Sequence, residues 1–253
     1  MRKLFIGPLA AIAMTALFFS CQQAPASKQE VVKTPDSATT VLPTPLREKV
    51  LSAEEQGALT PDMVIAALQE GNNSFVNNDL TARDHSAMVR NASQGQYPKA
   101  VILSCLDSRI PVEDVFNKGI GDIFVARVAG NFSNEDILGS MEFGCKVAGA
   151  KLILVLGHES CGAVKAAIDD VKLGNITAML TKIKPAVKNA ASYEGEKSSK
   201  NDEFVELVAK NNVLNTVETI KLKSPLLKEM VDKGEIKIVG AYYNLKTGVV
   251  TFL

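Results

Sequence analysis

The feature that most constrains the fold is an uninterrupted apolar run at residues 152–156, which contains only leucine, isoleucine and valine. A strand that is apolar on both faces is typical of a parallel sheet, because helices cover both faces of such a sheet. Two further runs, 100–104 and 123–128, have the composition of strands, and residues 137–148 and 163–171 have helical spacing. This alternation predicts an α/β fold, mainly a parallel β-sheet flanked by helices.

We expect a helical arm before this sheet and a hairpin after it. The arm begins at Thr60-Pro61, an N-cap residue followed by proline at the first helical position. Apolar residues of the arm can share one broad face, which we expect to pack on a neighbour. These residues are Met63, Ala66, Leu68 and Phe75. The end of the chain predicts two helices, a final strand and a hairpin turn, at 204–222, 225–233, 236–242 and 246–248.

Two short motifs follow two of the predicted strands: Cys105-Leu-Asp107-Ser-Arg109 and His158-Glu-Ser-Cys161. Because sites in parallel sheets collect beyond the carboxyl ends of the strands, we expect the two motifs to converge. Zinc prefers sulfur and nitrogen donors, and three protein ligands leave a fourth position open for water. Cys105, His158 and Cys161 are therefore predicted to bind Zn²⁺. An open zinc position forms hydroxide near neutral pH, which indicates a hydration or hydrolysis enzyme.

Asp107 and Arg109 are the candidate catalytic pair beside this metal. In a turn the two side chains meet, and an arginine fork holds a carboxylate rigidly and keeps it ionised. The carboxylate can then accept a hydrogen bond from metal-bound hydroxide. Two other interpretations stay open: Asp107 binds zinc as a fourth ligand and closes the site, or the pair only stabilises the turn.

The chain has four cysteines, Cys21, Cys105, Cys145 and Cys161. In an oxidising compartment a Cys105–Cys161 disulfide is the alternative to a metal site, although the charged side chains nearby favour the metal. We expect Cys145 to pack against the third strand. We expect His85, in a polar loop-like segment, to be a surface residue rather than a proton shuttle.

The N-terminus has the pattern of a signal peptide. Arg2 and Lys3 precede an apolar stretch at 4–19, and Ser20-Cys21 follow it. The stretch is too short and too close to the N-terminus for a mature membrane span. The small residue before Cys21 resembles a lipoprotein processing site, so we expect Cys21 to carry a lipid. An ordinary secretory signal is the alternative.

Three regions follow from this pattern. Residues 1–21 are predicted to be the signal peptide, and residues 22–55, rich in Ser, Thr, Pro, Lys and Ala, are predicted to be a flexible tether. Residues 56–253 are predicted to form the folded domain. We expect a membrane-anchored lipoprotein on the periplasmic or cell-surface side, or otherwise a soluble periplasmic or secreted protein.

The charge balance bears on the partners. Lys and Arg number 28 and Asp and Glu number 28, so the chain has no net charge. A nucleic-acid surface normally needs an excess of basic residues to displace counterions, so no nucleic-acid partner is expected.

On its two motifs the chain resembles the β-class carbonic anhydrases, in an exported, lipoprotein-like bacterial form. The resemblance runs from about Thr60 to the C-terminus, with the family's Cys-x-Asp-x-Arg and His-x-x-Cys motifs intact. Supporting matches lie at 96–98, 124–127 and 142–143. The resemblance implies a hydro-lyase, a homodimer or homotetramer, that reversibly hydrates carbon dioxide to bicarbonate and a proton through zinc-bound hydroxide.

The resemblance also implies a narrow substrate pocket at a dimer interface. Gln96 fits an amide that polarises a substrate oxygen, and Phe124 fits an apolar wall contributed by the partner chain. Phe143 falls where many relatives have tyrosine, so a hydroxyl contact is lost, and Gly162 keeps the approach to the metal open. Ordinary core positions are the alternative for both phenylalanines. Some relatives hold an inhibitory bicarbonate near a tryptophan, and this chain has no tryptophan.

Two other functions fit the same residues. Carbonyl sulfide or carbon disulfide is a linear molecule that the same site can hydrolyse. A non-catalytic zinc-binding or assembly protein needs only the three ligands, so the presence of Asp107 and Arg109 disfavours it.

Overall fold

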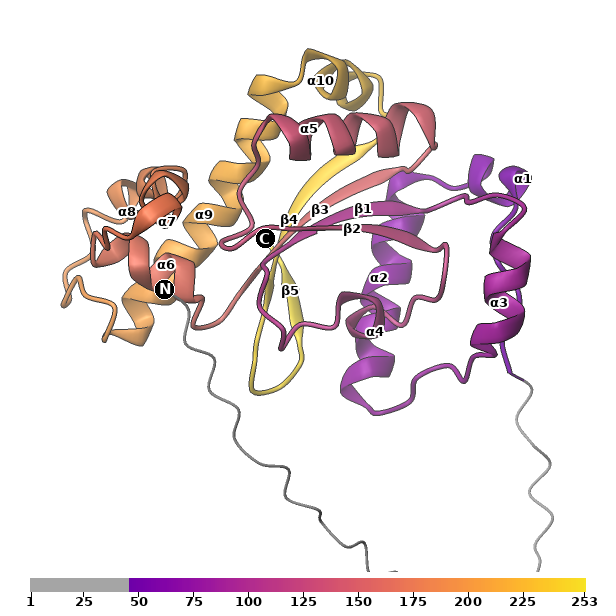
Figure 1. Ribbon diagram of the computed structural model, residues 1–253, viewed down its shortest axis with the longest axis horizontal. Coiled ribbons are helices and arrows are strands. Elements are labelled where there is room, and N and C mark those ends of the chain that lie inside the picture. Colours follow the sequence, from indigo (N-terminus) through magenta and orange to yellow (C-terminus); the bar gives the residue numbers. More distant parts are fainter. Residues whose placement is uncertain (1–45) are drawn as a thin grey trace, which may run out of the picture. The chain divides into compact units, whose positions relative to one another are not determined.

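The computed structural model describes residues 46–253 (Figure 1). The predicted signal peptide, Cys21 and most of the predicted tether lie outside the described residues. Among the helices within 46–253, none combines the length and the hydropathy needed to cross a membrane.

The centre of the fold is a five-stranded sheet in the order β2-β1-β3-β4-β5. β1 to β4 run parallel, and β5 pairs antiparallel with β4 to form the predicted C-terminal hairpin. The predicted α/β fold is thereby confirmed. The strands are β1 (Ala100–Ser104), β2 (Ile123–Arg127), β3 (Leu152–His158), β4 (Lys237–Tyr243) and β5 (Val250–Phe252).

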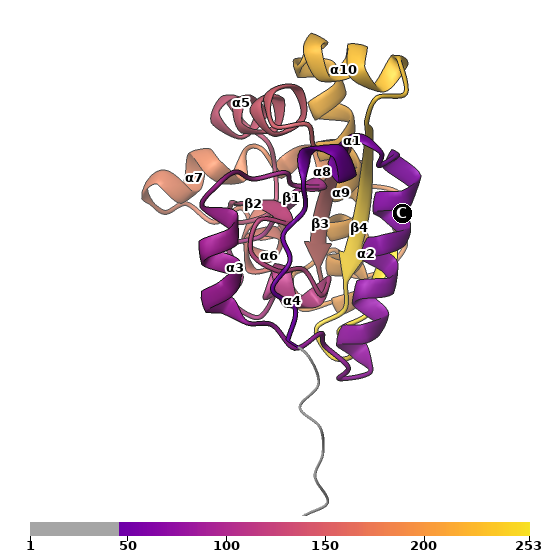
Figure 2. The same cartoon turned by 90° about the vertical axis from the view of Figure 1, so that its right-hand side faces the viewer.

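Helices cover both faces of the sheet (Figures 1 and 2). Successive side chains of β1 and β3 point to opposite faces, so both faces need a cover. One face packs on α2 (Pro61–Val76) and α4 (Val112–Val115). The other packs on α5 (Glu135–Glu142), the π-helix η1 (Phe143–Val147), α9 (Asp202–Lys223) and α10 (Pro225–Asp232). Cys145 of η1 is buried in this second layer, as predicted.

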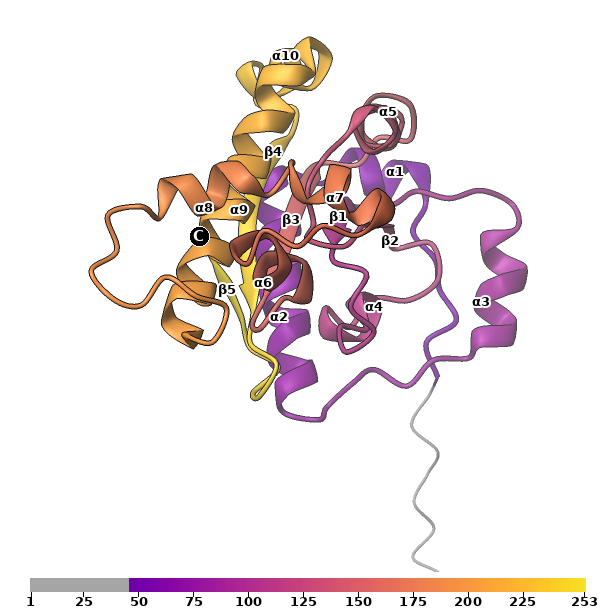
Figure 3. The same ribbon diagram turned by 60° about the vertical axis from the view of Figure 1, so that its left-hand side comes forward.

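A separate group of helices lies beyond the carboxyl end of β3 (Figure 3). α6 (Gly162–Ile168), α7 (Gly174–Leu180) and α8 (Lys184–Asn189) pack with the first half of α9 and enclose Cys105 and Cys161. α6 was predicted from the sequence, but α7 and α8 were not, because helices of six or seven residues are too short to show a helical period.

The helical arm differs from the prediction in its buried face. Thr60 caps α2 as expected, since its hydroxyl accepts a hydrogen bond from the backbone N–H of Met63. However, Met63 and Ala66 are exposed, while Val64 and Leu68 are buried against the sheet of the same chain. The apolar residues that face the sheet follow a spacing of four, which leaves Met63 and Ala66 on the opposite side.

His85 also lies in a different element from the one expected. It is the first residue of α3 (His85–Ala92), which Asp84 caps, and not part of a loop. Its side chain is exposed, so the surface position that the sequence predicted is confirmed.

The folded part begins before the predicted boundary at residue 56. Arg47 lies 3.0 Å from the buried carboxylate of Asp122, and α1 (Ala53–Gly57) follows. Within α1, the side-chain amide of Gln56 donates to the carbonyl oxygens of Pro98 (2.7 Å) and Ala148 (2.8 Å). The local composition predicted a tether here. It could not reveal these contacts, because they are made with residues far along the chain.

We predict that Gln56→Ala lowers the free energy of unfolding by about 2 kcal/mol. The substitution removes the amide that donates to two backbone carbonyl oxygens, and it leaves one of them buried without a partner. Urea unfolding followed by circular dichroism measures the change. Glu54→Ala, an exposed substitution in the same helix, is the matched control. Equal midpoints for the two variants would contradict a structural role for this segment.

Candidate metal centre

The structure brings the two motifs together at the carboxyl edge of the sheet. Cys105 directly follows β1, His158 is the last residue of β3, and Cys161 is the N-cap residue of α6. β1 and β3 are neighbours in parallel register, with Ser104 opposite Leu156. As a result, two sulfur atoms and one imidazole nitrogen lie within 4.8 Å of one another.

The sulfur atoms are spaced for a metal and not for a disulfide. Sγ of Cys105 lies 3.9 Å from Sγ of Cys161. Two sulfurs that each lie about 2.3 Å from a tetrahedral zinc ion are about 3.8 Å apart, whereas a disulfide needs about 2.05 Å. The two residues are separate thiols in the structure, so the disulfide that the sequence left open is not formed.

The imidazole of His158 has one nitrogen bonded to the backbone and the other buried beside the two sulfur atoms. Its Nδ1 lies 2.8 Å from the carbonyl oxygen of Glu159, which places the ring proton on Nδ1. Nε2 is buried and, among the described residues, has no hydrogen-bond partner. A buried nitrogen with a free lone pair beside two sulfurs fits Zn²⁺, because metal-bound histidines typically donate their second N–H to an oxygen.

The two thiols differ in acidity. A hydrogen bond with Cys161 lowers the pKa of the Cys105 thiol below its usual value, and the backbone N–H of Gly130 acts in the same direction. The hydrogen bond with Cys105 and burial both raise the pKa of the Cys161 thiol above its usual value. Two sulfur anions this close repel each other, so ionisation of one thiol opposes ionisation of the other.

Asp107 and Arg109 form a two-pronged ion pair beside the ligands. Arg109 Nε donates to Oδ1 of Asp107 (2.9 Å) and Nη2 donates to Oδ2 (2.6 Å). These bonds hold the pKa of the Asp107 carboxyl at about 2. Oδ2 also lies 3.9 Å from Nε2 of His158, so the carboxylate borders the position that a metal would take.

Arg127 supports the loop that carries Cys105 and Asp107. Its Nη1 donates to the carbonyl oxygens of Cys105 (3.2 Å) and Asp107 (3.1 Å), and its Nη2 donates to that of Ile110. One guanidinium therefore fixes three peptide groups of the loop. This function of Arg127 was not predicted from the sequence, although a charged residue at the end of an apolar strand was the available signal.

Glu159 ties the histidine to the C-terminal hairpin, and the sequence analysis missed it as well. Its backbone N–H donates to Tyr243 O (2.9 Å), and its Oε2 accepts from the backbone N–H of Leu245 (3.1 Å). Its Oε1 lies 3.1 Å from Nζ of Lys246. Glu159, whose carbonyl oxygen accepts the His158 ring proton, is therefore fixed by three contacts with the hairpin segment.

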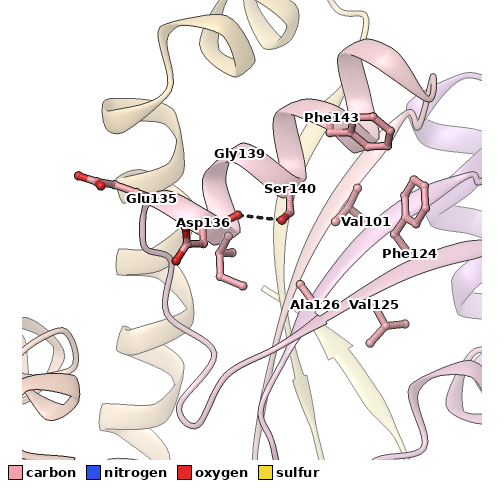
Figure 4. A pocket seen from close by; sticks show the side chains of 10 residues that line it. Val101, Phe124, Val125, Ala126, Glu135, Asp136, Gly139, Ser140 and Phe143 are labelled. Atoms are coloured by element: carbon pink, nitrogen blue, oxygen red, sulfur yellow. Dashed lines mark hydrogen bonds between the residues drawn. The ribbon is translucent and has the colours of Figure 1, made fainter. Parts of the chain in front are cut away.

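Phe124 and Phe143 lie together but away from the metal ligands. With Val101 they line a groove of about 790 Å³ between β2 and α5 (Figure 4). Phe143 is 53% exposed, so it is not a core position, whereas Phe124 is partly buried and packs against the core. The lining of this groove, in the described part of the chain, includes none of the three metal ligands.

Gln96 and Gly162 lie in opposite regions. Gln96 is exposed in the segment before β1, at the amino end of this strand, whereas Cys105 follows its carboxyl end. Gly162 opens α6 next to Cys161, and a Cβ added there would meet no described atom within 4 Å. Only Gly162 of the predicted pocket residues therefore lies next to the ligands of its own chain.

Comparison with known proteins identifies the family. The family profile described as "Carbonic anhydrase" matches residues 100–250, which include Cys105, His158 and Cys161. "Carbonic anhydrase 2" of Mycobacterium tuberculosis is 36% identical over 191 residues, which cover 72% of this chain and 87% of that protein. The chain belongs to the carbonic anhydrase family. The "Carbonic anhydrase" of Mycolicibacterium smegmatis is 35% identical over the same share of the chain and 88% of its own length.

Solved structures place this carbonic anhydrase in the β class. A Coccomyxa β-carbonic anhydrase in complex with acetazolamide has a TM-score of 0.59 and 27% identity, covering 75% of this chain and 84% of that chain. One of two tetrameric β-carbonic anhydrases from Sordaria macrospora has the same fold, with a TM-score of 0.60 at 22% identity, covering 76% and 97% of the two chains.

Proposed function

We propose that the protein is a zinc-dependent carbonic anhydrase, a hydro-lyase that interconverts carbon dioxide and bicarbonate. The observation that carries this proposal is the cluster of Cys105, His158 and Cys161, bordered by an ionised carboxylate, in a chain of the carbonic anhydrase family. Simple metal storage needs the three ligands but not the Asp107–Arg109 pair.

The metal-binding residues and Asp107 have different roles in the reaction. Zinc, when bound to the three ligands, supplies a water molecule with a pKa near 7. Asp107 accepts a hydrogen bond from the attacking oxygen and turns a lone pair of that oxygen toward the substrate. With a pKa of about 2, the Asp107 carboxylate does not retain a proton at neutral pH. The proton of the reaction therefore passes on to solvent.

Arg109 determines which of the two Asp107 arrangements is populated. Both carboxylate oxygens are engaged by the guanidinium, and a shift onto zinc as a fourth ligand would break at least one of these bonds. The side chain of Arg109 is 57% exposed and that of Asp107 is 15% exposed, so the arginine lies on the solvent side of the pair. We propose that Arg109 keeps the carboxylate in the arrangement that leaves the fourth metal position to water.

Asp107→Asn is expected to lower kcat/KM for hydration by about 100-fold while zinc stays bound, because the amide is neutral and no longer matches the guanidinium. A stopped-flow pH-indicator assay with metal analysis measures both. Since the Asp107 carboxyl has a pKa of about 2, it stays ionised through neutral pH and adds no acid limb to the pH profile above about pH 4.

Asp170→Asn is the matched control, because Lys184 and Lys172 likewise hold the pKa of that exposed carboxyl at about 2, on a surface ion pair. Full activity of a zinc-loaded Asp107→Asn protein would rule out the catalytic role. Removal of zinc by chelation must abolish hydration in the wild type. Sulfide release from carbonyl sulfide or carbon disulfide, assayed in parallel, measures the alternative hydrolysis.

We further propose a homodimer in which each substrate pocket uses residues of both copies. β2 is one of the two edge strands of the sheet, and the groove beside it contains Phe124 and the exposed Phe143. Gln96, Phe124 and Phe143 do not lie with the ligands of their own chain. A second copy seated on this edge covers the apolar groove and brings these side chains to the partner's metal.

Intersubunit complementation tests this arrangement. Gln96→Ala is expected to lower hydration about 10-fold or more, because a preorganised donor is lost, and Cys105→Ser is expected to abolish it. Co-expression of the two variants restores hydration above the mean of the separate variants, since a mixed dimer contains one complete site. Activity no higher than that mean would contradict a shared site. Gln94→Ala, an exposed neighbour, is the control.

We also propose that the protein is exported and tethered to a membrane by a lipid on Cys21. The sequence pattern at 1–21 supports this proposal. Metabolic labelling with a fatty-acid probe is expected to label the wild type and place it in the membrane fraction, while Cys21→Ala is unlabelled. Equal labelling of both proteins would contradict the proposal.

A further inference from the structure

The backbone N–H of Gly130 points at the sulfur of Cys105, and the orientation of Gly130 depends on Asn212 of α9. The backbone N–H of Gly130, three residues after β2, donates to Sγ of Cys105 over 3.3 Å in a buried environment. Hydrogen bonds to a metal-bound thiolate reduce the electron density that the sulfur gives to the metal, and they fix its direction. The orientation of Gly130 therefore bears directly on the metal site.

The peptide plane that follows Gly130 is held at both ends. The side-chain amide of Asn212 donates to the Gly130 carbonyl oxygen over 2.7 Å. On the other side of the same plane, the backbone N–H of Asn131 donates to Val128 O over 2.9 Å. Asn212 is only 1% exposed, so its amide has few competing partners.

Gly130 has no room for a side chain. Its φ is +87°, a left-handed conformation that favours glycine, and an added Cβ would lie 2.4 Å from Cδ1 of Ile183. The Gly130 N–H and the plane that Asn212 holds share the Gly130 Cα, so a shift of that plane on loss of Asn212 moves the N–H relative to the sulfur. A chain of two hydrogen bonds thus leads from α9, on the sheet face opposite α2, to the sulfur of Cys105.

We propose that Asn212 is a positioning residue that keeps the Gly130 N–H on the Cys105 sulfur and thereby tunes the bound metal. This inference rests on the proposed function for the identity of the metal site. The competing interpretation is that Asn212 only satisfies a buried carbonyl and has no influence on the metal. The two interpretations differ in what happens to the sulfur when Asn212 is removed.

The test uses the full chain with its metal replaced by spectroscopic probes. In the cobalt protein, Asn212→Ala is expected to shift the sulfur-to-cobalt charge-transfer band to longer wavelength, because a thiolate without its hydrogen bond donates more readily. Chelator competition is expected to show a loss of zinc affinity of about 10-fold or more. Thr219→Val, which removes a hydroxyl-to-carbonyl bond with Asn215 of the same helix and does not contact Asn212, is the matched control and leaves both quantities unchanged.

A second measurement does not depend on the variant folding. In the wild-type protein loaded with cadmium-113, the Gly130 amide proton is expected to show coupling to the metal through the N–H···S hydrogen bond. Its absence would overturn the inference, as would an unshifted charge-transfer band in a folded Asn212→Ala protein. A wild type that binds neither cobalt nor zinc would instead overturn the proposed function.

Discussion

The parallel pairing of β1 with β3 is the constraint on which the site depends. It brings the ends of two distant segments to one edge, so that Cys105 and His158 need no long loop to meet. Both strands are fully buried between helices, which fixes their register. Because the strands are rigid, the distance between the sulfur atoms is set by the fold and matches the size of a metal ion.

Around this cluster the chain uses neutral groups where water is absent and charged groups where water is near. The N–H of Gly130 and the carbonyl of Glu159 act on the ligands themselves. The guanidinium of Arg109, in contrast, lies at the exposed border and holds a carboxylate. A formal charge costs little in that position, because solvent screens it. This division places the charged pair at the exposed border of the cluster and the neutral groups in its buried part.

Much of the fold and of the ligand set could be predicted from the sequence, because both depend on local signals. The apolar run of β3 gave the sheet, and the residue types at 105 and 158–161 gave the metal. The supports of the site have no such signal. Asn212 is 82 residues from Gly130 along the chain, and an asparagine in a helix resembles any polar position until the fold is known. The same is true of Arg47 and Asp122. Their contact shows that the folded domain begins before residue 56, where the sequence had placed its start.

The link made by Glu159 has a thermodynamic consequence for the end of the chain. One residue belongs to the turn that carries the ligands and, through Leu245 and Lys246, to the base of the terminal hairpin. Ordering of the imidazole by an ion and ordering of the hairpin are therefore coupled equilibria. Such coupling is reciprocal, so each process favours the other by the same free energy. Loss of the Glu159 side chain therefore weakens the support of the hairpin and of the turn together.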